Sequence, residues 1–461
     1  MARNWIEKRQ SKLICMKKFL YLVFVFVSGI PLPGFAQDRL WNLEECIRYA
    51  IENSPKVNKQ KAQNDIYHQD YLSAIGRLIP SLNANSSAYF NYGRRVDSET
   101  NTYTNINSFS NSYSVYSNLT LFDGFSNIFK VRIQKVNKLA GKHELEQARE
   151  LIAYETMEAF LNLLYYERMV ELAEEQVVES RNNLKQVRRM EELGMKAETE
   201  VAEMAAKEAA DTYNLTKQKN LSAIGLILLK EKMHFPIDKE LHVTDEGSEV
   251  LIAKSDETAS DIFETAKTIH PKALSAESTV KMQELTVRSA IAGFSPTLSM
   301  EAGISTNFVK YLDGSAYLPF TDQLKNKRGS YVGFTLSIPI FNAFAKTTAL
   351  NRSRAQVVIA RNELDETLRS LYSEIEQAVA DRNGQADAYL QAVKQREAME
   401  TAHKANQRKY EEGLISPLEL HTSANRVVQA RAEQLNAELQ YRLKERLVRY
   451  YKGERFGSYE L

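Results

Sequence analysis

Two halves of this 461-residue chain carry the same short motifs in the same order, and this repeat constrains the fold more than any other feature. The clearest pairs, 216 to 219 positions apart, are Ser73-Ala74-Ile75 with Ser289-Ala290-Ile291, Pro80-Ser81-Leu82 with Pro296-Thr297-Leu298, and Leu121-Phe122-Asp123 with Ile340-Phe341-Asn342. The change of spacing falls within two polar segments, 93–112 and 307–330, where loop length varies at little cost. The chain therefore consists of two copies of one structural unit.

Each copy has the same predicted parts: a helix, two strands around a polar loop, a very long helix, a tight turn and a returning helix. The first helices are expected at 42–78, where Asn42 and Glu45 are spaced like a capping box, and at 260–292. The predicted divisions are a signal peptide (1–36), the first repeat (37–230), an equatorial linker (231–259), the second repeat (260–452) and a C-terminal tail (453–461).

The long helices are predicted from what the sequence lacks. Residues 125–193 contain no proline and one glycine, Gly141, and residues 345–412 again contain no proline and one glycine, Gly384. At about 1.5 Å per residue, each helix would be roughly 100 Å long. Apolar residues recur there at spacings of three and four, which an ordinary coiled coil or helical bundle would also show.

Four segments, two within 81–122 and two within 297–341, alternate apolar and polar side chains. Each run has the length that a tilted strand needs to cross a bilayer, with the polar set facing a wet lumen. A half-buried soluble sheet would alternate in the same way, but the export signal and the lack of another core favour the membrane. Four strands cannot close a barrel, so copies must associate, and two or three copies would supply eight or twelve strands.

Residues 16–36 have the charged start, apolar core and small-residue cleavage site of a secretory signal, with a retained anchor helix as the alternative. Residues 1–15 precede a second methionine, Met16, which is the better start for a signal peptide and the alternative start of translation. Removing residues 1–36 leaves 54 basic and 58 acidic side chains, a net charge of −4, which argues against nucleic-acid binding. Cys46 then remains alone and has no intramolecular disulfide partner.

The landmarks together resemble the outer-membrane efflux protein family, the TolC-like channels. The stretches that carry the resemblance are Leu43-Glu44-Glu45 with Asn53-Ser54-Pro55, Leu78-Ile79-Pro80-Ser81-Leu82, Leu121-Phe122-Asp123-Gly124, and Tyr410-Glu411-Glu412-Gly413-Leu414-Ile415-Ser416. The resemblance covers residues 40–452. It implies a homotrimer in the outer membrane, extending into the periplasm, with a twelve-stranded β-barrel continuous with an α-helical barrel. It also implies a tripartite efflux or type I secretion system, with a periplasmic adaptor and an inner-membrane transporter as partners.

The hairpin turns are where mechanism is expected. Gly413 reads as a left-handed helix cap. Ser416 is predicted to cap the next helix, with Pro417 at its first position and Glu419 completing a capping box. The first repeat has Ala197 at the place of Ser416, so it is expected to keep the turn and lose the capping hydroxyl. The predicted adaptor-docking tips are Gly194, Met195, Lys196, Gly413, Leu414 and Ile415.

The resemblance implies a gate at the periplasmic mouth, made by Glu419, Tyr410, Glu200 and Thr422. In this arrangement Glu419 points into the mouth, and Tyr410 pairs with Glu200 to hold it shut. Thr422 replaces a second acidic position, and Ile415 replaces an arginine that would reinforce the latch. The alternative for Glu419 and Glu200 is helix capping or a solvated helix face.

The sequence does not predict an enzyme. Its seven histidines include no pair at metal-binding helix spacing, and it has no phosphate-binding glycine loop or nucleophile elbow. We therefore expect no metal and no cofactor. Two other classes stay open: a periplasmic adaptor, which would carry one hairpin and a soluble β-domain, and a structural coiled-coil protein.

Overall fold

The structure is a computed structural model that describes residues 40–96, 101–105, 107–245, 252–314 and 316–457. The predicted signal peptide lies outside these residues. The first half contains β1 (Leu40–Trp41), α2 (Leu43–Asn53), α3 (Pro55–Gly76), β2 (Ser81–Asn91), β3 (Arg94–Val96), β4 (Tyr103–Asn105), β5 (Ser108–Phe122), α4 (Ser126–Glu192) and α5 (Glu198–Met233). The second contains β6 (His242–Val243), α6 (Ala259–Ile269), α7 (Pro271–Ala292), β7 (Thr297–Tyr311), α8 (Phe320–Asn326), β8 (Gly329–Ser337), α9 (Ala345–Glu411) and α10 (Pro417–Tyr451).

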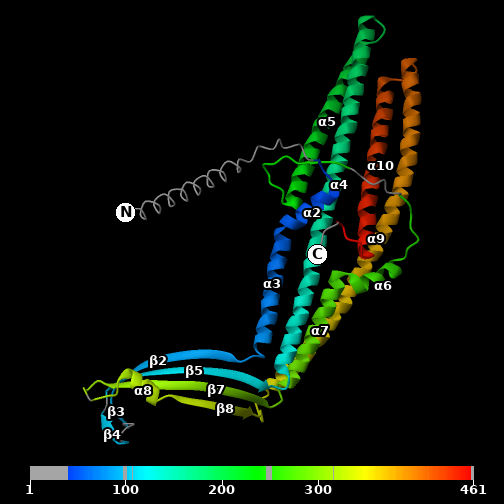
Figure 1. Ribbon diagram of the computed structural model, residues 1–461. Helices are drawn as coiled ribbons and strands as arrows, with labels where there is room; N and C mark the ends of the chain where they lie inside the picture. Colours follow the sequence, from blue (N-terminus) through cyan, green and yellow to red (C-terminus); the bar gives the residue numbers. More distant parts are fainter. Residues whose placement is uncertain (1–39, 97–100, 106, 246–251, 315, 458–461) are drawn as a thin grey trace, which may run out of the picture.

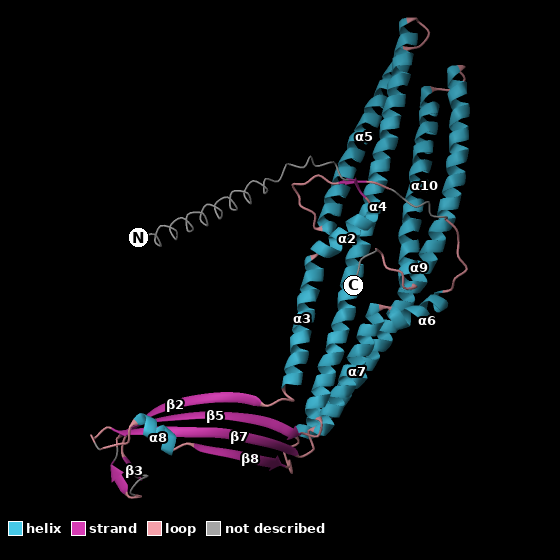
Figure 2. Ribbon diagram, viewed as in Figure 1, coloured by secondary structure: helices cyan, strands magenta, loops and turns pink. Residues whose placement is uncertain are grey.

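Two long helical hairpins lie side by side, and a sheet projects from the end opposite their turns (Figures 1 and 2). α4 pairs with α5 in the first hairpin, and α9 pairs with α10 in the second. α4 and α9 have 67 residues each, so each is roughly 100 Å long, as predicted. Among the described residues, no helix combines the length and the apolar character that crossing a membrane would require.

The leading helix of each repeat is broken in two, which corrects the prediction of one helix over 42–78 and one over 260–292. The breaks fall at Ser54-Pro55 and His270-Pro271, because the residue before a proline disfavours the helical conformation. Each new helix begins with proline at its first position and a side-chain cap. Ser54 Oγ accepts the Val57 N–H at 3.4 Å, and His270 Nδ1 accepts the Lys272 N–H at 3.2 Å. The predicted Asn42–Glu45 capping box is confirmed.

The four main strands form one antiparallel sheet in the order β2-β5-β7-β8, so the two repeats meet between β5 and β7. The register places Ala84 beside Val115, and Val115 beside Ile304. These residues share one face of the sheet, which is mainly apolar. The residues between them share the other face, which is rich in serine and asparagine and carries Glu301. The predicted alternation is therefore continuous across the junction of the repeats.

The strand ends differ from the prediction in three places. β8 stops at Ser337, so the expected strand over 338–340 is wrong, and Pro339 explains this because it cannot donate a ladder hydrogen bond. β5 and β7 extend into the segments predicted as loops, to 15 residues each. The remaining loop segments contain the short β3–β4 hairpin in the first repeat and the helix α8 in the second.

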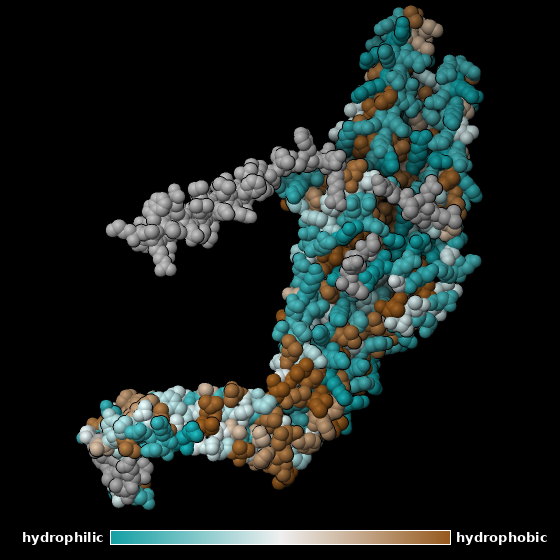
Figure 3. All heavy atoms as spheres, viewed as in Figure 1, coloured by the Kyte–Doolittle hydropathy of each residue, from teal (hydrophilic) through white to brown (hydrophobic). Residues whose placement is uncertain are grey.

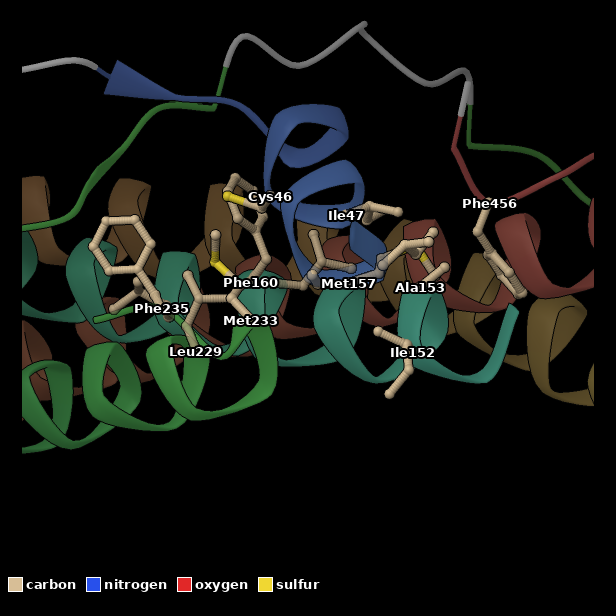
Figure 4. Packing of buried hydrophobic residues seen from close by; sticks show 14 of the residues in the cluster. Cys46, Ile47, Ile152, Ala153, Met157, Phe160, Leu229, Met233, Phe235 and Phe456 are labelled. Atoms are coloured by element: carbon tan, nitrogen blue, oxygen red, sulfur yellow. The ribbon is translucent and has the colours of Figure 1, made fainter. Parts of the chain in front are cut away.

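The largest buried core lies midway along the helical part, where α2 packs against α4 and α5, and Leu439 and Leu443 of α10 belong to the same cluster. Figure 4 shows Cys46 and Ile47 of α2 beside Phe160 and Met157 of α4. All four side chains are at most 2% exposed. Burial raises the pKa of the Cys46 thiol to about 12, so this cysteine packs as a small apolar side chain rather than a reactive thiolate.

An aromatic collar, defined as Phe122, Phe125, Phe341 and Phe344, lies where the sheet joins the helices. In each repeat the two rings meet edge to face, with centroids 5.6 Å apart in the first and 5.7 Å in the second. Phe125 and Phe344 adopt the left-handed conformation, with φ of 70° and 65°, which is rare outside glycine. Figure 3 shows apolar residues gathered at this junction. Such a band of exposed aromatic residues is typical of a membrane–water boundary.

We expect opposite effects from alanine at the two glycines of the long helices. A Cβ at Gly141 would lie 2.6 Å from the Tyr67 ring and also against Asn64 Oδ1, whereas a Cβ at Gly384 meets nothing. Gly141→Ala should therefore destabilise the protein by about 1–3 kcal/mol through overpacking. Gly384→Ala should stabilise it by about 0.5–1 kcal/mol, because alanine favours the helix. Thermal unfolding in mild detergent measures both, and shifts of the same sign would contradict the α3–α4 contact.

Candidate functional site

Both hairpins turn through the same hydrogen-bonded motif. Gly194 and Gly413 have φ of 71° and 73°, which confirms the predicted left-handed cap. The N–H of Gly194 donates to Glu191 O at 2.8 Å, and that of Met195 donates to Met190 O at 2.8 Å. The second turn repeats this pair of bonds, with Gly413 to Tyr410 at 3.0 Å and Leu414 to Lys409 at 2.8 Å. This double closure is the Schellman motif, and it holds each tip in one shape.

The tips carry exposed apolar side chains. Met195 is 69% exposed and Leu414 is 68% exposed, and Leu193 and Leu418 beside them are 70% and 65% exposed. Ile415 is only partly buried. The two tips therefore end in apolar surface, although the flanking helices are rich in charged residues.

The second returning helix starts at Pro417 as predicted, but within the described residues only the Ser416 half of the predicted capping box is formed, and the Glu419 carboxylate is exposed. Ser416 Oγ accepts the backbone N–H of Glu419 at 3.2 Å, and Pro417 stands at the first helical position. This capping bond uses the backbone of Glu419 and not its side chain. Thr422, one turn later, is also exposed, and its hydroxyl donates to Leu418 O of the same helix at 2.8 Å. At the first tip, Ala197 supplies no side-chain cap, as expected.

The expected pairing of Tyr410 with Glu200 is not formed as a hydrogen bond. Within the described part of the chain, the Tyr410 hydroxyl has no hydrogen-bond partner, although it is buried. The ring packs with an apolar cluster formed by Leu184, Val187 and Met204, and this burial raises the pKa of Tyr410.

Lys196 occupies the position between the two predicted partners. Its ammonium lies 2.7 Å from a Glu200 oxygen and 5.4 Å from the centre of the Tyr410 ring. The hydrogen bond from Lys196 to Glu200 raises the pKa of the lysine. A lysine therefore links the carboxylate to the face of the aromatic ring, through a cation–π contact. The sequence resemblance did not reveal this link, because it concerned the tyrosine and the acid alone.

A polar seam joins the two hairpins just behind the tips. Lys207 of α5 binds Asp211 at 2.5 Å and Asn425 of α10 at 3.1 Å. His403 of α9 contacts Ser423 at 2.8 Å and Glu179 of α4 at 3.6 Å. The contact with His403 lowers the pKa of Glu179. The Lys207–Asn425 bond and the His403–Glu179 contact join the second hairpin to the first.

His421 lies in this seam, in a small pocket that also includes Lys207 and Asp211. Burial and the nearby Lys207 lower the pKa of His421, which favours the neutral ring. Within the described ranges, no three residues of the metal-ligand types come together.

Comparison with known proteins agrees with the fold. The family described as "Outer membrane efflux protein" matches residues 46–225 and 264–453, one match in each repeat. Outer membrane protein TolC of Escherichia coli (strain K12) is 21% identical over 440 residues, which span 92% of this chain and 85% of that protein. The chain therefore belongs to the outer membrane efflux protein family.

Solved structures show the same fold at low sequence identity. A crystal structure of CusC superposes with a TM-score of 0.76 at 15% identity, covering 93% of this chain and 98% of CusC. The Campylobacter jejuni CmeC outer membrane channel superposes with a TM-score of 0.74 at 15% identity, covering 90% of this chain and 87% of CmeC. The predicted class of duplicated helical hairpins joined to a membrane sheet is confirmed.

Family membership decides between the classes that the sequence left open. The chain is an outer-membrane channel component of an efflux system, and not a periplasmic adaptor or a structural coiled-coil protein. The family is one of channels rather than of enzymes.

Proposed function

We propose that three copies of this chain form one continuous duct through the outer membrane and into the periplasm. The observation that carries this proposal is the four-stranded sheet, whose edge strands β2 and β8 have no partner strand within the described protomer. Unpaired strand edges are not tolerated in lipid, and four strands are too few to close a barrel. Three copies would give twelve strands, with the serine- and asparagine-rich face turned to the lumen.

The wall of the proposed duct would be built by two repeats, residues 37–230 and 260–452. Residues 231–259 would be a linker at the equator of the duct. The exported substrate would enter from a periplasmic adaptor fed by an inner-membrane transporter. The adaptor would dock on the tips, Gly194-Met195-Lys196 and Gly413-Leu414-Ile415, because these are the ends of the hairpins and carry exposed apolar side chains.

The gate is proposed at the same end. Three copies of Glu419 would meet near the axis and form a ring of carboxylates, which favours cations in a narrow pore. Tyr410, Lys196 and Glu200 would brace the two hairpins against each other, through the ring–lysine–carboxylate stack. Thr422 adds a hydroxyl but no charge, so the proposed ring is single.

Glu419→Gln should reduce the cation selectivity of the pore toward none. Glutamine keeps the shape of the side chain, and the capping bond uses the Glu419 backbone, so stability should not change. Thr422→Glu should have the opposite effect, because it adds a second ring one turn away. Reversal potentials in planar bilayers measure selectivity, and Glu412→Gln is the matched control at an exposed carboxylate of the same tip. Unchanged selectivity in Glu419→Gln would leave Glu419 as a helix-start residue only.

A further inference from the structure

The helix α8 lies on the apolar face of the sheet, at the end far from the hairpins (Figure 1). Thr306 Oγ1 donates to Leu324 O at 2.8 Å, and the rings of Phe308 and Phe320 are 5.1 Å apart. Side chains alternate along β7, so Thr306 and Phe308 project from the same face as Ile304. α8 therefore covers the face that is proposed to meet lipid, and not the face that lines the lumen.

One buried side chain fixes α8 to the sheet. Gln323 is 3% exposed, and its amide oxygen accepts the Val309 N–H at 3.0 Å while its amide nitrogen donates to Val309 O at 2.8 Å. The pairing of β7 with β8 ends at Ser305, so Gln323 occupies the place of the missing strand. Two bonds to one backbone unit hold the helix in a single position, unlike an ordinary surface loop.

The surface of this element combines exposed apolar side chains with a basic rim, defined as Lys310, Lys325, Lys327 and Arg328. All four rim residues are exposed. Residues 310–328 contain these four cations and only two acids, Asp313 and Asp322. Leu318 and Phe320 beside the rim are 49% and 45% exposed. Apolar side chains next to a row of cations are typical of surfaces that lie among anionic lipid headgroups.

We propose that α8 and the basic rim bind the phosphate groups of phosphorylated lipids in the outer leaflet. The inference rests on the proposed function, because it requires the apolar face of the sheet to be the membrane face. Continuity favours a lipid over a protein partner, because α8 packs on that apolar face through Thr306 and Phe308, and α8 lies at the opposite end of the molecule from the tips (Figure 1). The lipid phosphates would meet the rim, while Leu318 and Phe320 contact the upper part of the acyl chains.

Lys325→Gln/Lys327→Gln/Arg328→Gln tests the proposal. The detergent-solubilised protein is titrated with diphosphoryl lipid A and with its monophosphoryl form, and affinity is followed by thermophoresis. Each cation near an anionic headgroup contributes to binding, so the triple variant should bind diphosphoryl lipid A about tenfold more weakly or worse. The wild type should prefer the diphosphoryl form. The matched control is Lys185→Gln/Arg188→Gln/Arg189→Gln, which removes three exposed cations from α4 far from the sheet and should bind like the wild type.

Three results would overturn the inference. Equal affinity in both triple variants would show that the rim is not used. Equal binding of the two lipids would show that the acyl chains alone are recognised, and competition by inorganic phosphate at the same concentration would show a simple anion site. Conductance in planar bilayers distinguishes failure of the lipid site from failure of the proposed function. A protein that forms channels but fails these tests overturns only the lipid site, whereas one that forms no channel overturns the proposed function as well.

Discussion

Aspartate at both tips, Met195→Asp with Leu414→Asp, should abolish export while leaving the protein in the outer membrane. The two side chains are 69% and 68% exposed and would be buried against the adaptor in the proposed complex. An unpaired carboxylate buried in an apolar contact costs about 2 kcal/mol or more. Two such losses weaken the docking by about a thousandfold. The hydrogen bonds that shape each turn come from the backbone, so the tips themselves should persist.

Export is measured as the accumulation of a panel of fluorescent efflux substrates in the native host, with the variant replacing the resident copy. Met195→Leu with Leu414→Met is the matched control, because it keeps both tips apolar. Ile237→Asp is a second control, since Ile237 is 94% exposed but lies after α5, away from the tips. Normal export by the double aspartate variant, at normal amounts in the outer membrane, would exclude docking through these side chains.

The second large effect is a loss of stability at mildly acidic pH that depends on His270. This side chain is 7% exposed, stacks on Tyr451 with centroids 5.7 Å apart, and caps α7. Burial lowers its pKa to about 4, with Lys272 acting in the same direction and Glu374 against it. The unfolded chain therefore takes up the proton first, near its ordinary pKa of about 6.5. The stability that the neutral ring contributes is present above pH 6.5 and is lost progressively as the pH falls to about 4.

The lowered pKa of His270 corresponds to a loss of about 3 kcal/mol in the free energy of unfolding per protomer, between pH 6.5 and about pH 4. His270→Ser should remove this dependence, because it copies Ser54, which caps the matching helix of the first repeat without a titrating group. The variant should lose some packing against Tyr451 at every pH. Thermal midpoints from pH 8 to pH 4 in mild detergent measure the slope, and His234→Asn is the control at an exposed histidine. Parallel slopes for the wild type and His270→Ser would contradict this account.

The repeat explains why so much of the fold could be predicted from the sequence. Two copies of each signal support each other, so the long helices, the four strands and the turns at Gly194 and Gly413 were predicted together. The predicted helix and strand bounds are wrong where a proline interrupts the element. Ser54-Pro55 and His270-Pro271 break their helices, and Pro339 ends β8 early. The sequence does not reveal α8, because its residues resemble a polar loop. The bonds of Gln323 to Val309, in the part of β7 beyond its pairing with β8, hold the helix in place.

The candidate site was less accessible from the sequence. The turn geometry follows from glycine and proline chemistry, which is local and could be predicted. The predicted Tyr410–Glu200 pairing depends on side-chain positions across two hairpins. In the structure the Glu200 carboxylate binds Lys196 instead of the Tyr410 hydroxyl. The polar seam of Lys207, Asn425 and His403 joins residues more than 200 positions apart or on different hairpins, and no spacing along the chain marks them as partners.

The central claim is that copies of the chain close a barrel that one chain cannot close. The most direct test is the mass of the detergent-extracted protein, measured by light scattering after fractionation of the cell envelope. We expect the protein in the outer-membrane fraction, with a protein mass of three protomers. A monomer recovered in the soluble periplasmic fraction would contradict the account.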